Sequence, residues 1–95
     1  MPTKTINGIE YQIGPNANLS GANLRSADLR GANLKWANLS YTSLFNANLQ
    51  GVDLSFANLT GANLHYANLT NANLTNANTQ FADLRDADVR GTKGL

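Results

Sequence analysis

The sequence repeats every five residues from Ala17 to Gly91, and the register never slips. The fifteen units share Ala at the first position in thirteen cases and Leu at the third position in thirteen cases. The second position is Asn or Asp in every unit except that of Ser43, whereas the last two positions vary widely. A fixed period over most of a chain is typical of stacked structural repeats, so the repeat decides the architecture.

A period of five fits neither an α-helix nor a β-strand. In a helix it would rotate each Leu by about 140° from the last, and in a strand it would place successive Leu side chains on opposite faces. The chain must therefore turn once in every unit. Four short extended segments and four corners close a square coil of twenty residues, and such coils stack about 4.8 Å apart. Ala and Leu then point inward, and the Asn or Asp between them points outward.

This pattern resembles that of pentapeptide repeat proteins, whose units follow A-(D/N)-L-x-x. The resemblance covers Ala17 to Gly91, about four-fifths of the chain. It implies an all-β fold: a right-handed quadrilateral parallel β-helix, or solenoid, of just under four coils. The coils would stand roughly 18 Å tall at the interstrand spacing. Leucine-rich repeats, with periods of 20–29 residues, and left-handed β-helices with six-residue repeats do not fit.

The non-repeating segments suggest that the first coil of the β-helix is covered by a cap and that the last coil is not. In residues 1–16, Asn7-Gly8 lies between two β-favouring runs and predicts a capping hairpin over the first coil. Residues 17–91 are the predicted β-helix. Residues 92–95 are expected to form a short C-terminal tail, too short and too rich in glycine to cover the last coil.

The expected core consists of the third-position aliphatic side chains. Thr79 places a hydroxyl among them, so we expect a weakened core or a backbone hydrogen bond there. Thr42 and Val52 enlarge the Ala site and are expected to bulge the wall slightly. The predicted core residues are Leu19, Leu24, Leu29, Leu34, Leu39, Leu44, Leu49, Leu54, Leu59, Leu64, Leu69, Leu74, Leu84 and Val89.

The fifth position of each unit describes the corners. Nine units carry Gly, Asn or Asp there, the residues that tolerate the positive φ of a type II turn. Five others carry an aromatic residue, for which positive φ is costly. We therefore expect mixed corner geometry, with another turn class at Trp36, Tyr41, Phe56, Tyr66 and Phe81.

Stacking at twenty residues also predicts the outer faces. Asn18, Asn38, Asn58 and Asn78 share a column, where side-chain amides can form a stabilising ladder. Their face carries no charge and is flanked by aromatic residues. Either these aromatic residues only shield backbone at corners that lack glycine, or the face binds a sugar or a partner protein. The candidate interaction surface comprises Trp36, Tyr41, Phe56, Phe81, Arg85, Asp88, Val89 and Arg90.

The sequence offers little chemistry. It contains no Cys, and His65 is the single histidine, so no Cys or His metal cluster is expected. We expect His65 to project to solvent beside Arg25, Phe45 and Arg85 in its column. No segment resembles a nucleophile elbow, and a filled interior leaves no pocket that excludes water. We therefore predict no catalytic residues, no cofactor and no enzymatic activity.

Net charge and hydropathy argue against nucleic acid and membranes as partners. The formal net charge is +1, too small for electrostatic capture of nucleic acid. The sequence shows no long apolar run and no leader-like segment, so the expected location is the cytoplasm, without membrane contact.

These features favour a non-catalytic structural or protein-interaction scaffold. It would act on an unknown protein partner through its faces and its exposed C-terminal coil, with end-to-end homodimerisation through that coil as the most concrete form. The resemblance implies an alternative, since some pentapeptide repeat proteins mimic DNA and bind DNA gyrase. The short chain and balanced charge disfavour it. Carbohydrate binding on the aromatic-flanked face is a third reading.

Overall fold

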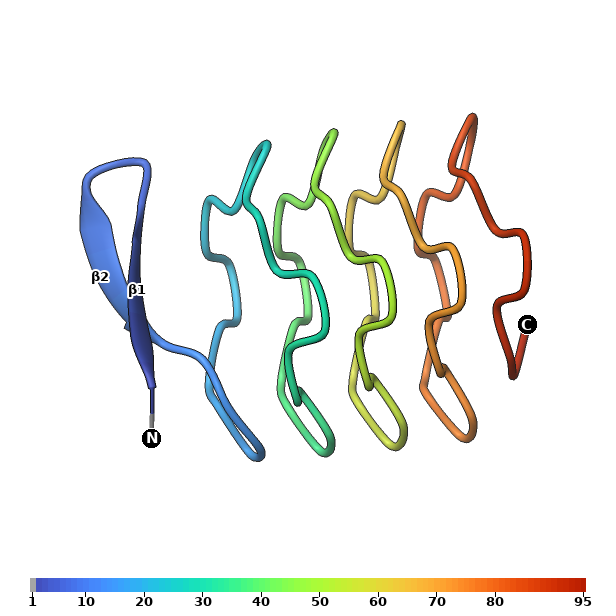
Figure 1. Cartoon of the computed structure of the whole chain (residues 1–95), viewed down its shortest axis with the longest axis horizontal. Coiled ribbons are helices and arrows are strands. Elements are labelled where there is room, and N and C mark those ends of the chain that lie inside the picture. Colours follow the sequence, from blue (N-terminus) through green and yellow to red (C-terminus); the bar gives the residue numbers. More distant parts are fainter. Residues whose placement is uncertain (1) are drawn as a thin grey trace.

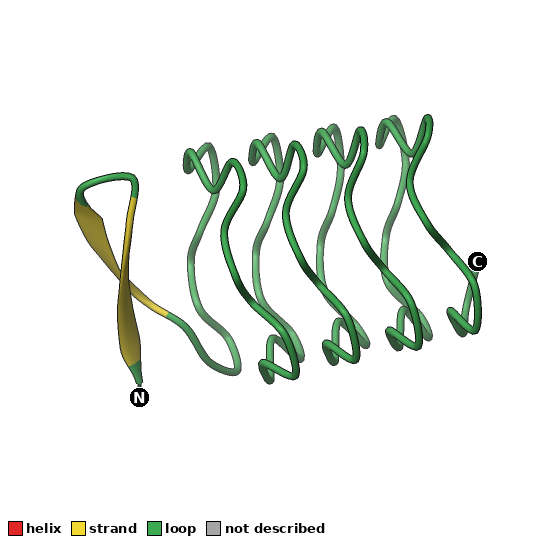
Figure 2. Cartoon of the chain, turned by 45° about the horizontal axis from the view of Figure 1, so that its top comes forward, coloured by secondary structure: helices red, strands yellow, loops and turns green. Residues whose placement is uncertain are grey.

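A computed structural model describes residues 2–95 as a row of stacked coils with a hairpin at one end (Figure 1). The hairpin comprises strands β1 (Thr3–Ile6) and β2 (Ile9–Gln12). The molecule measures 29 × 22 × 22 Å, and the coils follow one another along its longest axis. Figure 2 draws everything after the hairpin as loops, because the coils pair through single bridges between corners.

The coils are held in register by backbone pairing at a separation of twenty residues. Twelve parallel bridges, from Asn18↔Asn38 to Asn73↔Lys93, all have this separation. The Leu19 N–H donates to the Asn38 carbonyl at 2.8 Å, and the Asn38 N–H donates back to the Ala17 carbonyl at 2.9 Å. The same pattern recurs from coil to coil, which confirms the predicted twenty-residue lap and the β-helix.

The ladder extends beyond the predicted boundary at Gly91. Lys93 pairs with Asn73, and the Thr92 hydroxyl donates to the Leu69 carbonyl at 2.6 Å. Thr92 occupies the position of the repeat's Ala and begins another unit. Assigning all of residues 92–95 to a tail was therefore wrong.

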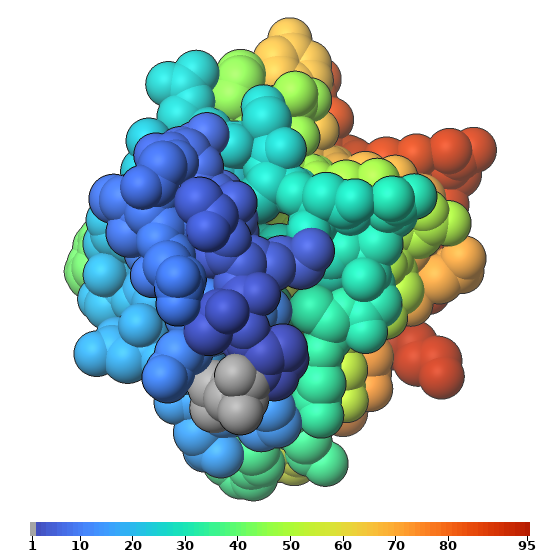
Figure 3. Space-filling view, turned by 60° about the vertical axis from the view of Figure 1, so that its left-hand side comes forward, coloured from blue at the N-terminus to red at the C-terminus, as the bar shows by residue number. Residues whose placement is uncertain are grey.

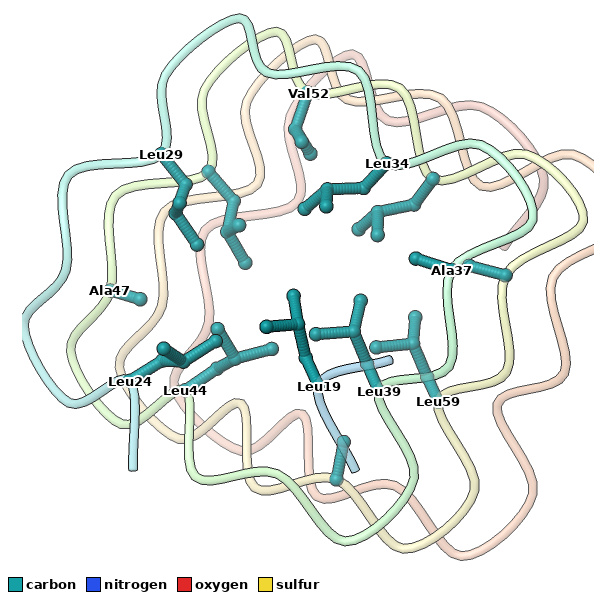
Figure 4. Packing of buried hydrophobic residues seen from close by; sticks show 14 of the residues in the cluster. Leu19, Leu24, Leu29, Leu34, Ala37, Leu39, Leu44, Ala47, Val52 and Leu59 are labelled. Atoms are coloured by element: carbon teal, nitrogen blue, oxygen red, sulfur yellow. The ribbon is translucent and has the colours of Figure 1, made fainter. Parts of the chain in front are cut away.

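The interior is filled by the predicted leucines, which point toward one another across the coil (Figure 4). Leu19, Leu39 and Leu59 lie side by side along one wall, and every Leu from Leu24 to Leu74 at the third position is fully buried. Leu84 is only partly buried, and Val89 is 42% exposed. Leu84 still packs against the core, whereas placing Val89 in it was wrong, because no further coil within residues 2–95 covers this layer.

The enlarged wall positions do not interrupt the ladder. The residues after Thr42 and Val52 still donate to the preceding coil at 3.0 Å, and the buried Thr42 hydroxyl bonds to the Leu19 carbonyl at 2.8 Å. Thr79 lies in the last coil and is half-buried, so its hydroxyl disturbs no interior layer.

The corners share one geometry, contrary to the mixed geometry expected. The fifth residue of every unit has positive φ, including the aromatic residues at 57–67°. The Ala37 N–H donates to the Leu34 carbonyl at 3.0 Å, which places Trp36 third in a type II turn. Left-handed backbone costs a non-glycine residue on the order of 1–3 kcal/mol. The ladder imposes it nonetheless, because the Trp36 N–H must reach the Ser55 carbonyl, 3.0 Å away.

The outward Asn and Asp side chains bond within their own unit. The Asn58 Oδ1 accepts the Thr60 N–H at 3.0 Å and the Thr60 hydroxyl at 2.6 Å. Equivalent bonds recur at each second-position Asn or Asp, whereas the Asn18–Asn78 column shows no amide-to-amide bond in the described chain. The Asn pattern is thus explained by Asx turns rather than by the predicted amide ladder.

The N-terminal hairpin covers the mouth of the first coil as predicted. Its strands pair antiparallel around Asn7-Gly8, both of which have positive φ. Ile6 and Ile13 are buried beneath it. The Asn7 amide donates to the carbonyls of Asn23 and Arg25 at 3.2 and 3.1 Å, so the turn itself ties the cap to the coil.

Truncating one interior leucine should test the packing. Leu44 is fully buried in the second coil, so Leu44→Ala should lower the free energy of unfolding by about 2–5 kcal/mol. Val89→Ala at the partly exposed rim should cost about 1 kcal/mol or less. Urea unfolding followed by circular dichroism measures both, and equal losses would contradict the assigned core.

Removing one Asx acceptor should test the second position. Asn58→Ala deletes the acceptor for both Thr60 donors and should cost about 1 kcal/mol. Asn58→Asp keeps the oxygen and is the matched control. The idea fails if both variants unfold at the same urea concentration as the parent chain.

Candidate interaction surfaces

The last coil presents an open rim formed by residues 77–93. Six of its N–H groups donate no hydrogen bond within residues 2–95, although their equivalents in earlier coils all do so. These N–H groups belong to Thr79, Phe81, Leu84, Asp86, Val89 and Gly91. The Ala77, Ala82 and Ala87 carbonyls are also unused in the described chain. The rim therefore offers donors and acceptors together with the partly exposed Leu84 and Val89.

Charged pairs lie beside this rim. The Asp83 and Arg85 side chains form a two-pronged ion pair, with oxygen-to-nitrogen distances of 2.9 and 2.7 Å. Asp88 and Arg90 repeat it, as do Asp28 and Arg30 in the first coil. Hydrogen bonds from Arg30 and Arg85 lower the pKa values of Asp28 and Asp83 to about 2. Three predicted interaction residues are thus already engaged in ion pairs: Arg85 with Asp83, and Asp88 with Arg90.

The aromatic residues predicted to flank the uncharged face stand at two corners. Trp36 and Phe56 stack with ring centroids 4.3 Å apart and planes 13° apart. Each ring therefore hides one face against the other. At the next corner Tyr41 lies against Gly61, where a Cβ would come within 2.5 Å of its ring, and Phe81 is 81% exposed. Glycine at residue 61 leaves the space that the Tyr41 ring fills.

Sequence reasoning missed a second aromatic cluster. His65 packs against Tyr66 with centroids 4.0 Å apart and lies near Phe45, while the Arg25 guanidinium stands 5.0 Å from the Phe45 ring. The His65 Nδ1 lies 2.8 Å from the Arg85 carbonyl oxygen. His65 therefore does not simply project to solvent, because its neighbours at twenty-residue spacing hold it against the wall. The twenty-residue spacing predicted that Arg25, Phe45, His65 and Arg85 share a column, but it did not predict the contacts of their side chains.

The described residues give little support for a metal site. No three His, Cys, Asp or Glu side chains of residues 2–95 gather closely enough to hold a metal ion. The same part of the chain has no helix long and apolar enough to cross a membrane.

Comparison with known proteins matches this geometry to one family. The family model for pentapeptide repeats matches residues 17–55 and 53–91. The chain is a pentapeptide repeat protein. Its fold is accordingly the right-handed quadrilateral β-helix that the family resemblance implied. A search of curated protein sequences finds no match.

Three solved pentapeptide repeat proteins are similar to this one. One, from Nostoc Pcc 7120, is 36% identical with a TM-score of 0.80, and the match covers 81% of this chain and 64% of that one. HetL from Nostoc sp. strain PCC 7120, involved in heterocyst differentiation regulation, is 40% identical with a TM-score of 0.56, covering 84% and 39%. A thylakoid-lumen protein of Arabidopsis thaliana is 33% identical with a TM-score of 0.52, covering 83% and 60%. The match thus spans less than two-thirds of each relative.

The ion pairs should make stability depend on pH in the acid range. The pKa values of Asp28 and Asp83 are lowered from 3.8 to about 2, so between these values the unfolded chain binds more protons than the folded one. The ion pairs should therefore contribute fully to the free energy of unfolding above about pH 4, and this contribution should be lost as the pH falls toward 2. Urea unfolding across this range at low ionic strength measures the slope.

The control removes the partners of these carboxylates. A variant carrying Arg30→Gln, Arg85→Gln and Arg90→Gln should show a shallower slope, because the carboxylates then titrate closer to their usual pKa. Added salt should reduce the slope of the parent chain, since all three pairs are exposed. Identical slopes for parent and variant would rule out the Asp–Arg pairs as the cause.

Proposed function

We propose that this pentapeptide repeat protein is a non-catalytic protein-interaction scaffold that docks through the rim of its last coil. The observation that carries the proposal is the set of six N–H groups on this rim that donate no bond within residues 2–95. An open β-edge is a ready template for pairing with another chain. Leu84 and Val89 supply apolar surface beside it.

The most concrete partner is a second copy of the chain. The rim carries unused donors and acceptors together, so two rims related by a two-fold axis can satisfy one another. The Asp83–Arg85 and Asp88–Arg90 pairs give both signs of charge at the rim's outer edge. A two-fold partner can therefore meet opposite charges as well as backbone.

The size of the rim indicates how tight such a dimer would be. The coil cross-section of 22 × 22 Å corresponds to a flat area of about 500 Å² per copy, about 1,000 Å² for both, near the lower limit of specific interfaces. We therefore expect a reversible dimer whose population depends on concentration.

The other readings receive less support from this geometry. A DNA-like role toward gyrase would need an acidic surface, whereas the formal net charge is +1. Carbohydrate binding would use exposed ring faces, but Trp36 and Phe56 stack on one another.

A concentration series with matched variants tests the dimer. Sedimentation equilibrium of the chain should show a mass rising from one copy to two. Val89→Asp places a charge inside the contact and should hold the mass at one copy, because an unpaired charge is costly to bury. Val89 is 42% exposed in the single chain, so the variant should still fold, which circular dichroism checks.

The control adds the same charge elsewhere. Ser20→Asp lies on the wall of the first coil, away from the rim, and should dimerise like the parent chain. A single-copy mass for the parent at every accessible concentration refutes the homodimer, and equal loss in both variants refutes its location at the rim.

A further inference from the structure

Two hollows run along strand β1 on the side where it faces the first coil. One, of about 310 Å³, lies between residues 4–7 and 25–28. The other, of about 360 Å³, lies between residues 2–4, 13–15 and 30–33. Both are lined by Lys4, where they meet, and neither is lined by β2. Figure 3 looks toward this end, where the hairpin lies over the first coil and the surface is hollowed beside it.

One wall of this groove is an unpaired strand edge. The Ile13 N–H donates to the Pro2 carbonyl, and the Lys4–Tyr11 and Ile6–Ile9 pairs follow with the same alternation. The N–H and C=O groups of Thr3 and Thr5 therefore point away from β2. Neither residue bonds to the first coil in residues 2–95. Strand β1 thus presents a free edge to the groove.

The opposite wall of the groove, formed by the first coil, also has backbone N–H groups without an acceptor in residues 2–95. In the second coil, the Asn48 and Asp53 N–H groups donate to the coil before them at 2.9 and 3.0 Å. The equivalent groups of the first coil, on Asp28 and Asn33, donate to nothing in the described chain. The hairpin covers the leucines of this coil without pairing with this part of its edge.

The lining is apolar in the second hollow and positively charged at the junction. Ile13, Pro15 and Ala32 contribute apolar surface to the second hollow. Lys4 and Arg25 form no ion pair within residues 2–95, whereas Arg30 is neutralised by Asp28. An occupant with an acidic residue near Lys4 and an apolar side chain near Ile13 would complement both features.

We propose that the groove accepts an extended acidic segment of a partner protein, which adds to the hairpin as a third strand along β1. The groove spans residues 2–7, a length of roughly 17 Å in extended chain, which suits a short strand better than a compact small molecule. Main-chain hydrogen bonds to Thr3 and Thr5 provide affinity, and the two hollows select the side chains. The site lies at the opposite end from the rim and does not depend on dimerisation.

A pair of proline variants separates this edge from the rest of the hairpin. Thr5→Pro removes an N–H from the free edge of β1 but none from the β1–β2 ladder. Glu10→Pro is the matched control, because Glu10 pairs with Thr5 across the hairpin and directs its N–H to the free edge of β2. The charge pair is Lys4→Glu, with Lys35→Glu outside the groove as its control. Thermal unfolding confirms that each variant is folded.

The probe is a phage-displayed library of random linear peptides selected on the intact chain. Fluorescence anisotropy then gives the affinity of each enriched peptide after synthesis. We expect acidic peptides whose affinity falls about tenfold or more with Thr5→Pro and stays within about twofold with Glu10→Pro. Lys4→Glu should weaken binding and Lys35→Glu should not. Hydrogen exchange should show new protection of the Thr3 and Thr5 amides.

Several results would overturn the proposal. The first is that no peptide is enriched over the uncoated surface, and the second is that Thr5→Pro and Glu10→Pro lose equal peptide affinity. The others are that Lys4→Glu leaves peptide affinity unchanged, or that the peptides protect amides only in residues 77–93. Displacement of the peptides by a second copy of the chain would also overturn it, since the groove would then serve self-association. Val89→Asp should leave peptide binding unchanged, so failure of the dimer and failure of the groove are distinguishable.

Discussion

The backbone ladder at twenty residues per lap is the constraint on which every other feature depends. It places each residue beside its counterpart in the next coil, so leucines meet leucines inside and corners meet corners outside. It is also strong enough to overrule local preference, since Trp36, Tyr41 and Phe56 adopt a left-handed backbone that aromatic residues normally avoid. One fixed period thereby determines the interior, the walls and the corners together.

The sequence predicted the features that follow from local sequence pattern. It did not predict those that depend on contacts between residues far apart in the chain. The five-residue period gave the lap length and the buried leucines from Leu24 to Leu74, and the Asn7-Gly8 turn signal gave the N-terminal hairpin. The sequence pattern did not give the corner geometry, because aromatic residues individually disfavour positive φ and only the backbone ladder between coils imposes it. It also missed the packing of His65 on Tyr66 and the groove beside β1, since these depend on contacts between coils and across the cap.

The first and last coils within residues 2–95 differ in how their interiors are covered. The first coil is covered by Ile6 and Ile13 and tied to the hairpin through the Asn7 amide. The last coil within residues 2–95 has Thr79, Val89 and Gly94 at three of its four core positions, where earlier coils have leucine, and ion pairs beside its rim. Less apolar surface at these positions and flanking charges lower the tendency of an open edge to aggregate indiscriminately. They still leave unused donors for a partner that matches them.

Under the proposed scaffold function, recognition is concentrated where the backbone ladder stops. Along the walls, the backbone groups are already hydrogen-bonded to adjacent coils. The Oδ1 atoms of the Asn and Asp side chains accept hydrogen bonds within their own units. A partner on a wall can therefore compete only for side-chain surface, chiefly that of the exposed aromatic residues Trp36, Tyr41, Tyr66 and Phe81. At the rim and along β1, main-chain donors and acceptors have no partner within residues 2–95, and the rigid stack behind them fixes their geometry. Because that order is already present before binding, a strand that docks at either place meets a preorganised template.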